Sequence, residues 1–371
     1  MRGWLIEEHL GRRGIIYGLP RAEPLPKMGE AFGHSKAGRC EMEICKKCVL
    51  NESFPGIRFD GNGVCNFCRS SEDGKKLESV KGEYAQRFEA LVTELKGKNC
   101  YDGLLAYSGG KDSTYTLYLM KEKYGLKLLA FSFNNWFQSE RASKNIQNVL
   151  MHMGIDHLVL SPSFEVLREI LRVSVQQELY PIKALGRATS ICTTCLSLVR
   201  FASLKVAIEK EIPLVIFAMS PGQAPVATSI FKTNPAMLRK MQSAIYQPLY
   251  RYLGEAIRPY FLEERHFAKG DSFPYSVNPL AFLGYDEREI YRSIQQIGWL
   301  PPEDTDANST NCLLNAFANQ VHQEKYGFHP YAFEMAGLVR MGILSREEGL
   351  HRLAQPGDPG LIGKVKEKLN I

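Results

Sequence analysis

Several features that would assign this chain to a common class are missing from its sequence. The 371 residues contain no G-x-x-x-x-G-K-[ST] motif, which excludes the Walker type of phosphate-binding loop. No apolar run approaches the length that a bilayer-spanning helix needs, and the first residues lack the apolar stretch of a signal peptide. We therefore expect a cytoplasmic protein with no membrane partner.

Clusters of positive charge are also scarce. The formal net charge is +6, and basic residues follow one another only in pairs such as Arg12-Arg13 and Lys46-Lys47. A nucleic-acid-binding surface usually shows clustered lysine and arginine. The composition permits binding to tRNA but does not favour it.

Cysteine is the residue type that does follow a pattern. Nine cysteines are an odd number, and six of them form C-x-x-C pairs. In a chain this long without a signal peptide, such pairs indicate metal or redox chemistry rather than a disulfide scaffold. Cys40 and Cys100 stand alone and are interpreted as spare thiols.

The first two pairs form a predicted metal module. Sixteen residues separate Cys45 and Cys48 from Cys65 and Cys68, and at this spacing two C-x-x-C knuckles can close one tetrahedral site. The turn sequence Asp60-Gly-Asn-Gly63 between them predicts a hairpin. We expect structural Zn²⁺ on these four thiolates.

A glycine-rich turn joins a predicted strand, 101–107, to a predicted helix, 113–124. This layout presents backbone N–H groups and the positive end of a helix to a phosphate group. Two glycines let the backbone approach closely and adopt positive φ. The candidate phosphate-binding residues are Ser108, Gly109, Gly110, Lys111, Asp112, Ser113 and Thr114.

The S-G-G-K-D-S sequence of this turn resembles the PP-loop of the ATP pyrophosphatase superfamily. Enzymes of that superfamily cleave ATP between the α- and β-phosphates, adenylate a carbonyl or amide oxygen, and let a nucleophile displace AMP. The resemblance implies that the loop binds ATP, that Lys111 and Asp112 are catalytic, and that Asp112 helps to hold Mg²⁺. Phe133 ends the next predicted strand, 127–133, and Asn134 follows it, so both are expected near the ribose or adenine.

Strands and helices alternate from residue 101 to residue 223, which predicts a doubly wound parallel α/β sheet. The PP-loop resemblance implies a fold like that of the adenine nucleotide α-hydrolases. The predicted parts of the chain are a poorly ordered N-terminal arm (1–40), a zinc-ribbon-like module (41–72), a linker helix (73–100), the ATP-binding domain (101–235) and a mostly helical, substrate-side region (236–371).

The third cysteine pair lies at the start of a predicted helix that runs to residue 208. Thiols at a helix N-terminus have a lowered pKa, which makes them better nucleophiles or ligands, so Cys192 and Cys195 are candidate catalytic residues. Cys312 also stands where a predicted helix begins.

Two family resemblances differ in the nucleophile that they imply. The cysteine knuckles, the Pro55–Asp60 segment, the Ser108–Ser113 loop, Lys325–Phe328 and Arg346–Glu348 resemble the N-acetyl sugar amidotransferases of surface-polysaccharide pathways, most strongly over 41–223. This resemblance implies nitrogen transfer to a small sugar-type acceptor, with ammonia supplied by a separate glutaminase. A homodimer is left open.

The second resemblance is to the Fe–S-dependent tRNA thiolation enzymes, which also combine a zinc module, a PP-loop, a C-x-x-C pair and a later lone cysteine. It implies that Cys192, Cys195 and Cys312 hold a [4Fe–4S] cluster, with a sulfur-donor protein as partner and tRNA or a small molecule as acceptor. A third interpretation is a non-enzymatic nucleotide-binding regulator that senses metal or redox state. The complete Lys111-Asp112-Ser113 sequence argues against it.

Overall fold

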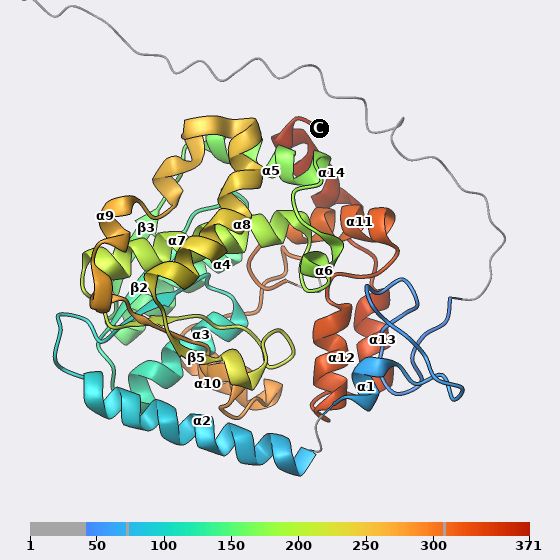
Figure 1. The fold of residues 1–371 in the computed structure, drawn as a ribbon, viewed down its shortest axis with the longest axis horizontal. Coiled ribbons are helices and arrows are strands. Elements are labelled where there is room, and N and C mark those ends of the chain that lie inside the picture. The colour runs from blue at the N-terminus through green and yellow to red at the C-terminus, as the bar shows by residue number, and fades with distance from the viewer. Residues whose placement is uncertain (1–41, 72–73, 307–308) are drawn as a thin grey trace, which may run out of the picture. The chain divides into compact units, whose positions relative to one another are not determined.

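A six-stranded sheet organises the part of the chain that the computed structural model describes, residues 42–71, 74–306 and 309–371 (Figure 1). These residues belong to one unit, 41–371. The predicted arm, 1–40, and Cys40 lie outside the described residues. The strands are β1 (Gly103–Ala106), β2 (Leu128–Phe133), β3 (Asp156–Leu160), β4 (Leu214–Ile216), β5 (Ile230–Lys232) and β6 (Tyr275–Val277).

The strand order is β3-β2-β1-β4-β6-β5, and all neighbours are parallel except β5 and β6. Successive residues of β1 serve opposite faces, because Leu104 joins one hydrophobic cluster and Leu105 the other. A strand buried on both faces needs a nearly continuous apolar run, as in the Leu128–Phe133 strand, where Ser132 is the one polar residue. The predicted doubly wound sheet is therefore confirmed, and β5 and β6 are additions too short for the sequence pattern to reveal.

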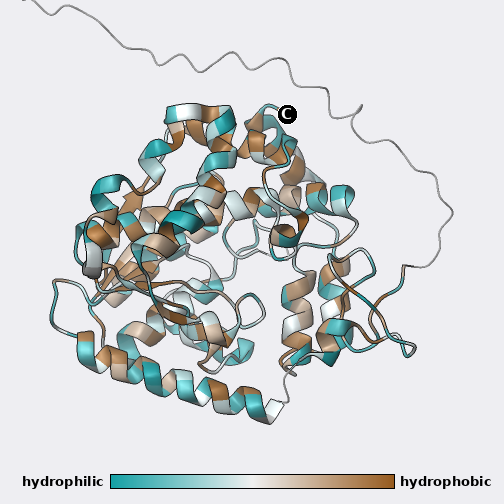
Figure 2. Cartoon of the chain, in the orientation of Figure 1, coloured by the Kyte–Doolittle hydropathy of each residue, from teal (hydrophilic) through white to brown (hydrophobic). Residues whose placement is uncertain are grey.

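Helices cover both faces of this sheet. The first cluster packs α7 (Ser190–Glu209) against the strands, with α5 (Phe164–Gln176) and α8 (Pro235–Leu253) stacked beside it. The second cluster contains residues of four further α-helices, which are α2 (Gly74–Leu95), α3 (Lys111–Tyr118), α4 (Glu140–Met153) and α10 (Glu287–Gln296). A π-helical segment, Leu119–Lys123, continues α3. In Figure 2 the strands are mostly brown, whereas α2 alternates brown and teal.

The helix α7 is long and apolar enough to span a membrane by length and composition, with a mean hydropathy of 1.6, although no such run was expected. Half of that window is buried inside the fold, and the helix packs against β1, β2 and β4. It therefore serves here as a core helix between the sheet and the outer helices.

A third hydrophobic cluster joins the four-cysteine module to the C-terminal helices. Phe54 of the module packs against Phe328 and stacks on Phe333, with ring centroids 5.3 and 5.7 Å apart. Figure 1 shows α1, α12 and α13 together at this place. The remaining helices are α1 (Asn66–Arg69), α6 (Ile182–Leu185), α9 (Glu264–Phe267), α11 (Leu314–Tyr326), α12 (Ala332–Arg340), α13 (Arg346–Ala354) and α14 (Pro359–Leu369).

Candidate functional site

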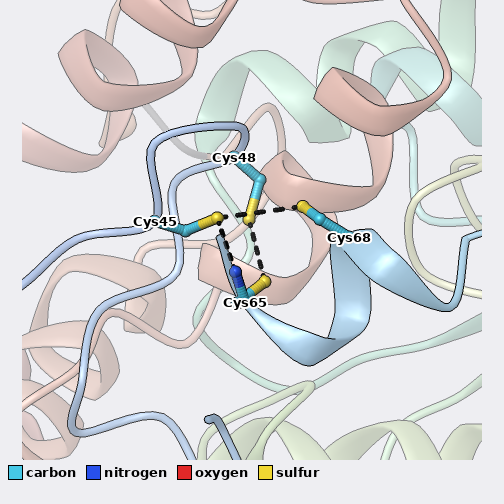
Figure 3. Close-up of side chains that lie close together, drawn as sticks. All are labelled: Cys45, Cys48, Cys65 and Cys68. Carbon is cyan, nitrogen blue, oxygen red and sulfur yellow. Dashed lines mark hydrogen bonds between the residues drawn. The ribbon is translucent and has the colours of Figure 1, made fainter. Parts of the chain in front are cut away.

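The four N-terminal cysteines converge on one point (Figure 3). Their sulfur atoms all lie within 4.8 Å of one another, with 3.9 Å between Cys45 and Cys68 and 3.7 Å between Cys48 and Cys65. Two sulfurs bound to one tetrahedral Zn²⁺ at about 2.3 Å are roughly 3.8 Å apart. The donor set therefore fits a single ion, and zinc remains the prediction for its identity.

Burial makes this group of thiols difficult to ionise without a cation. It raises the pKa of Cys48 well above the ordinary value and that of Cys68 to about 11. For Cys45 burial acts in the same direction, but backbone N–H groups, first that of Cys65, bring the pKa down to about 7. Several thiolates cannot share this space unless a metal ion compensates their charge.

The PP-loop has the strand–turn–helix geometry that its sequence predicts. Gly109 has φ of 74°, and a Cβ there would lie 2.7 Å from the carbonyl oxygen of Ala142, so only glycine fits. The Trp299 indole donates to the carbonyl of Gly109 (2.9 Å) and the Gln138 amide donates to that of Ser108 (3.0 Å). Gly110 caps α3, which places Lys111 and Asp112 in its first turn, two residues before the predicted helix start.

Lys111 is held by groups that sequence reasoning missed. Its Nζ donates to Glu287 Oε1 (2.7 Å) and to the Tyr285 hydroxyl (3.0 Å), and lies 3.5 Å from Asp112 Oδ1. Tyr285 in turn donates to Asp112 Oδ1 (3.0 Å). More than 170 residues separate Lys111 from these partners, as from Trp299, so no local spacing announces them.

The charges of this cluster follow from burial and pairing. Burial acts to lower the pKa of Lys111, but Asp112 and Glu287 outweigh it and hold the lysine charged. Burial raises the pKa of Asp112 against the opposing effect of Lys111. For Glu287 burial is outweighed by Arg352 and Lys111, which bring its pKa to about 2. A cation at Asp112 would favour its ionised form.

Cys312 lies with the Cys192–Cys195 pair, although more than 115 residues separate them in sequence. The Asn135 amide donates to Cys312 Sγ (3.3 Å) and also acts to lower the pKa of Cys195. An ionised Cys312 would raise the pKa of both Cys192 and Cys195. Among the described residues, however, only the four N-terminal cysteines lie at the mutual distances that one ion requires.

The expectation that a helix N-terminus lowers the pKa of these thiols is wrong. Thr189 caps α7 by accepting from the backbone N–H of Cys192 (2.9 Å). Burial is nevertheless the largest effect on Cys192 and raises its pKa to about 11. It raises the pKa of Cys195 and of Cys312 as well. The three thiols are therefore neutral unless a positive group enters the site.

The segment that carries Cys312 touches the PP-loop. Thr310 Oγ1 accepts from the backbone N–H of Lys111 (3.1 Å), and a Cβ on Gly110 would lie 3.0 Å from the same oxygen. Residues Gln138 and Cys312 also form an isolated antiparallel bridge. Cys312 is thus two residues away from Thr310, which contacts the PP-loop directly.

Glu334 of α12 interacts electrostatically with the PP-loop, and Tyr331, the residue before this helix, does so with two of the thiols. Glu334 accepts hydrogen bonds from Ser220 Oγ (2.5 Å) and Gln223 Nε2 (2.8 Å). Burial raises the pKa of both Glu334 and Tyr331. Asp112 acts to raise the pKa of Glu334, and Lys111 acts to lower it. Ionised Cys192 and Cys312 would raise the pKa of Tyr331 further. Glu334 is therefore within electrostatic range of Lys111 and Asp112, and Tyr331 within that of Cys192 and Cys312.

Phe133 and Asn134 lie at the carboxyl end of β2. Phe133 contacts Tyr260 edge-on at 6.3 Å, and Asn134 Oδ1 accepts from the backbone N–H of Trp136 (2.9 Å). Trp136 has φ of 61°, which is unusual for a residue other than glycine. The proposed contact of Phe133 and Asn134 with ATP stays a prediction.

No protein-family model matches the chain. It is 26% identical over 317 residues to an uncharacterized protein of Methanocaldococcus jannaschii, a match that covers 85% of this chain and 94% of that protein.

Several solved structures resemble the chain at low similarity, among them three enzymes. They are the U34-tRNA thiolase NcsA from Methanococcus maripaludis with its [4Fe–4S] cluster (16% identity, 82% of this chain and 90% of that chain, TM-score 0.32), NMN synthetase from Francisella tularensis (12%, 78% and 96%, 0.35), and the NH₃-dependent NAD synthetase from Campylobacter jejuni (14%, 81% and 94%, 0.32). These are PP-loop ATP pyrophosphatases, the superfamily that the S-G-G-K-D-S motif resembles. At these TM-scores the likeness assigns no activity, and the fold rests on the chain's own strand order.

Proposed function

We propose that this chain is an ATP-dependent transferase that adenylates an acceptor oxygen, releases pyrophosphate, and then exchanges the activated oxygen for another atom. The observation that carries the proposal is the placement of Lys111 and Asp112. Both stand in the first turn of α3, directly after the glycine turn that follows β1. The chain passes from β1 to β2 on one side and returns to β4 on the other, and ligands of such sheets bind where the strand order reverses.

The chain's own groups account for the first step. The backbone N–H groups of the loop and Lys111 bind the polyphosphate, and the lysine offsets the negative charge that develops on the departing pyrophosphate. The acceptor oxygen attacks the α-phosphorus while the bond to the β-phosphate oxygen breaks, and its electron pair leaves with pyrophosphate. Mg²⁺ at Asp112 would supply further positive charge at that oxygen. A nucleophile then forms a bond to the activated carbon, and AMP leaves with the former acceptor oxygen.

Sulfur is the nucleophile that the geometry favours. Cys312 belongs to the segment that contacts the loop, and it interacts with Cys192 and Cys195. The three thiols are partly buried, and their raised pKa values keep them neutral unless a positively charged group allows them to ionise. This donor set suits an Fe–S cluster, which would supply an iron with an open coordination position. The acceptor in this version is a tRNA or a small molecule, and a separate protein donates the sulfur.

Nitrogen transfer is the second candidate, and the sequence similarity to N-acetyl sugar amidotransferases supports it. The segment Arg346–Glu348, which is part of that resemblance, contacts the four-cysteine module. The Arg346 guanidinium donates to the carbonyls of Cys45 and Cys48. The acceptor is then a small sugar with an amide group, and a glutaminase provides ammonia.

The deciding experiment measures metal, acid-labile sulfide and pyrophosphate release on protein purified without oxygen. Sulfur transfer predicts iron and sulfide in excess of one structural ion, both lost in Cys195→Ser. Nitrogen transfer predicts one ion per chain and no sulfide. Asp112→Asn should abolish pyrophosphate release in either case, and undiminished release in that variant refutes the adenylation step.

A further inference from the structure

One helix contacts both the four-cysteine module and the carboxylate that binds the PP-loop lysine. At the start of α13, Arg346 Nε donates to the carbonyls of Cys45 and Cys48, each at 3.1 Å. Six residues later, Arg352 Nη2 donates to Glu287 Oε2 at 2.8 Å. Glu287 Oε1 accepts from Lys111 at 2.7 Å. The helix α13 and the polar contacts at Arg346 and Arg352 thus connect the cysteine loop to Lys111.

Glu287 is shared between two cations. The side chains of Lys111, Glu287 and Arg352 are 11%, 32% and 31% exposed, so solvent screens their charges only in part. The second acid on Arg352, Glu348, is half exposed and belongs to α13 itself. While Arg352 competes for Glu287, the carboxylate positions Lys111 without neutralising it fully. If Arg352 withdraws, the whole charge of Glu287 acts on the lysine and weakens its attraction for a triphosphate.

We propose that Glu287 and Arg352 are positioning residues for Lys111, and that α13 makes this positioning depend on the ion in the four-cysteine module. The inference rests on the proposed role of Lys111 in binding ATP. An ion on the four thiolates fixes the backbone between Cys45 and Cys48, whose carbonyls hold Arg346 and with it the first turn of α13. Loss of the ion releases this turn, and Arg352 moves away from Glu287.

Charge variants separate this coupling from a merely structural role of α13. With the full-length chain and ATP as ligand, Arg352→Gln should raise the Kd about tenfold, and Arg352→Lys should stay within about threefold of wild type. Glu287→Gln should bind ATP at least as tightly as wild type, and adding it to Arg352→Gln should restore most of the lost affinity. A structural role predicts instead that both single variants weaken binding and that the double variant is the weakest. Arg239→Gln, which breaks the exposed pair with Glu264, is the matched control and should change nothing.

Removal of the metal tests the second half of the proposal. Chelation should raise the Kd for ATP about tenfold in wild type but less than twofold in Arg352→Gln, because the connection is already broken there. An equal effect of chelation in both proteins, or an Arg352→Gln variant that binds ATP like wild type, overturns the coupling and leaves the proposed function standing. A metal-loaded wild type that binds no ATP overturns both.

Discussion

The two cysteine sites of this chain are built in opposite ways. In the module, two knuckles separated by sixteen residues bring four sulfurs within 4.8 Å of one another. In the second site, a pair on α7 lies near a third cysteine, residue 312, which accepts a hydrogen bond from Asn135. Thr310 of the same segment contacts the PP-loop. The first site is encoded by local spacing, and the second is a product of the whole fold.

The largest effect should come from breaking the local site. Cys48→Ser removes one of the four ligands of the module, so the ion that compensates the charge of the other buried thiolates is lost. We expect the free energy of unfolding to fall by an amount on the order of 4 kcal/mol. Denaturant titration together with metal analysis measures it. Cys100→Ser, at an exposed lone cysteine, is the control. An unchanged metal content in Cys48→Ser contradicts the module.

A methyl group on the PP-loop should disturb the second site, formed by Cys192, Cys195 and Cys312, without affecting the four-cysteine module. Gly110 has an ordinary φ of −77°, so Gly110→Ala adds no backbone strain, but its Cβ would meet Thr310 Oγ1 at 3.0 Å. We expect a cost of about 1 kcal/mol and altered thiol reactivity at Cys312, with the metal content retained. Gly82→Ala in α2, where a Cβ meets nothing within 4 Å, should instead stabilise the fold slightly. Identical behaviour of the two variants would show that the 309–312 segment does not depend on the loop.

Acid should weaken the connection between the two regions. The folded-state pKa of Glu287 is about 2, below its ordinary value of 4.5, because Arg352 and Lys111 outweigh burial. Its ionised form therefore contributes stability that is complete above about pH 4.5 and is lost as the pH falls toward 2. We expect Glu287→Gln to cost on the order of 1 kcal/mol at pH 7 and progressively less below pH 4.5, measured by urea unfolding. A difference that stays constant with pH is the contrary result.

The smallest effect on stability should come from replacing a cysteine of the second site. Cys312→Ser keeps the shape of a half-buried side chain and removes no ligand of the module, so the free energy of unfolding should change by less than about 0.5 kcal/mol. The same variant should lose any iron and sulfide that the wild type holds. Thermal unfolding and elemental analysis of one preparation give both answers. A large loss of stability would assign Cys312 to the core instead.

This contrast also explains what the sequence could and could not reveal. The strands β1 to β4, the PP-loop and the four-cysteine module depend on neighbouring residues, and local patterns predicted them. Tyr285, Glu287 and Trp299 reach the loop from more than 170 residues away, so only the fold identifies them. The thiol pKa prediction failed for a related reason, because burial is a property of the folded chain and outweighs the helix end.

The placement of Cys192 and Cys195 on α7 has a consequence for how this site can change. The body of α7 is packed against β1, β2 and β4, so two of the three thiols are anchored to the core of the sheet. The third comes from the connection before α11, outside the regular elements. Substitutions in one connecting segment can therefore change the position of Cys312. A change in the positions of Cys192 and Cys195 would require repacking of the core.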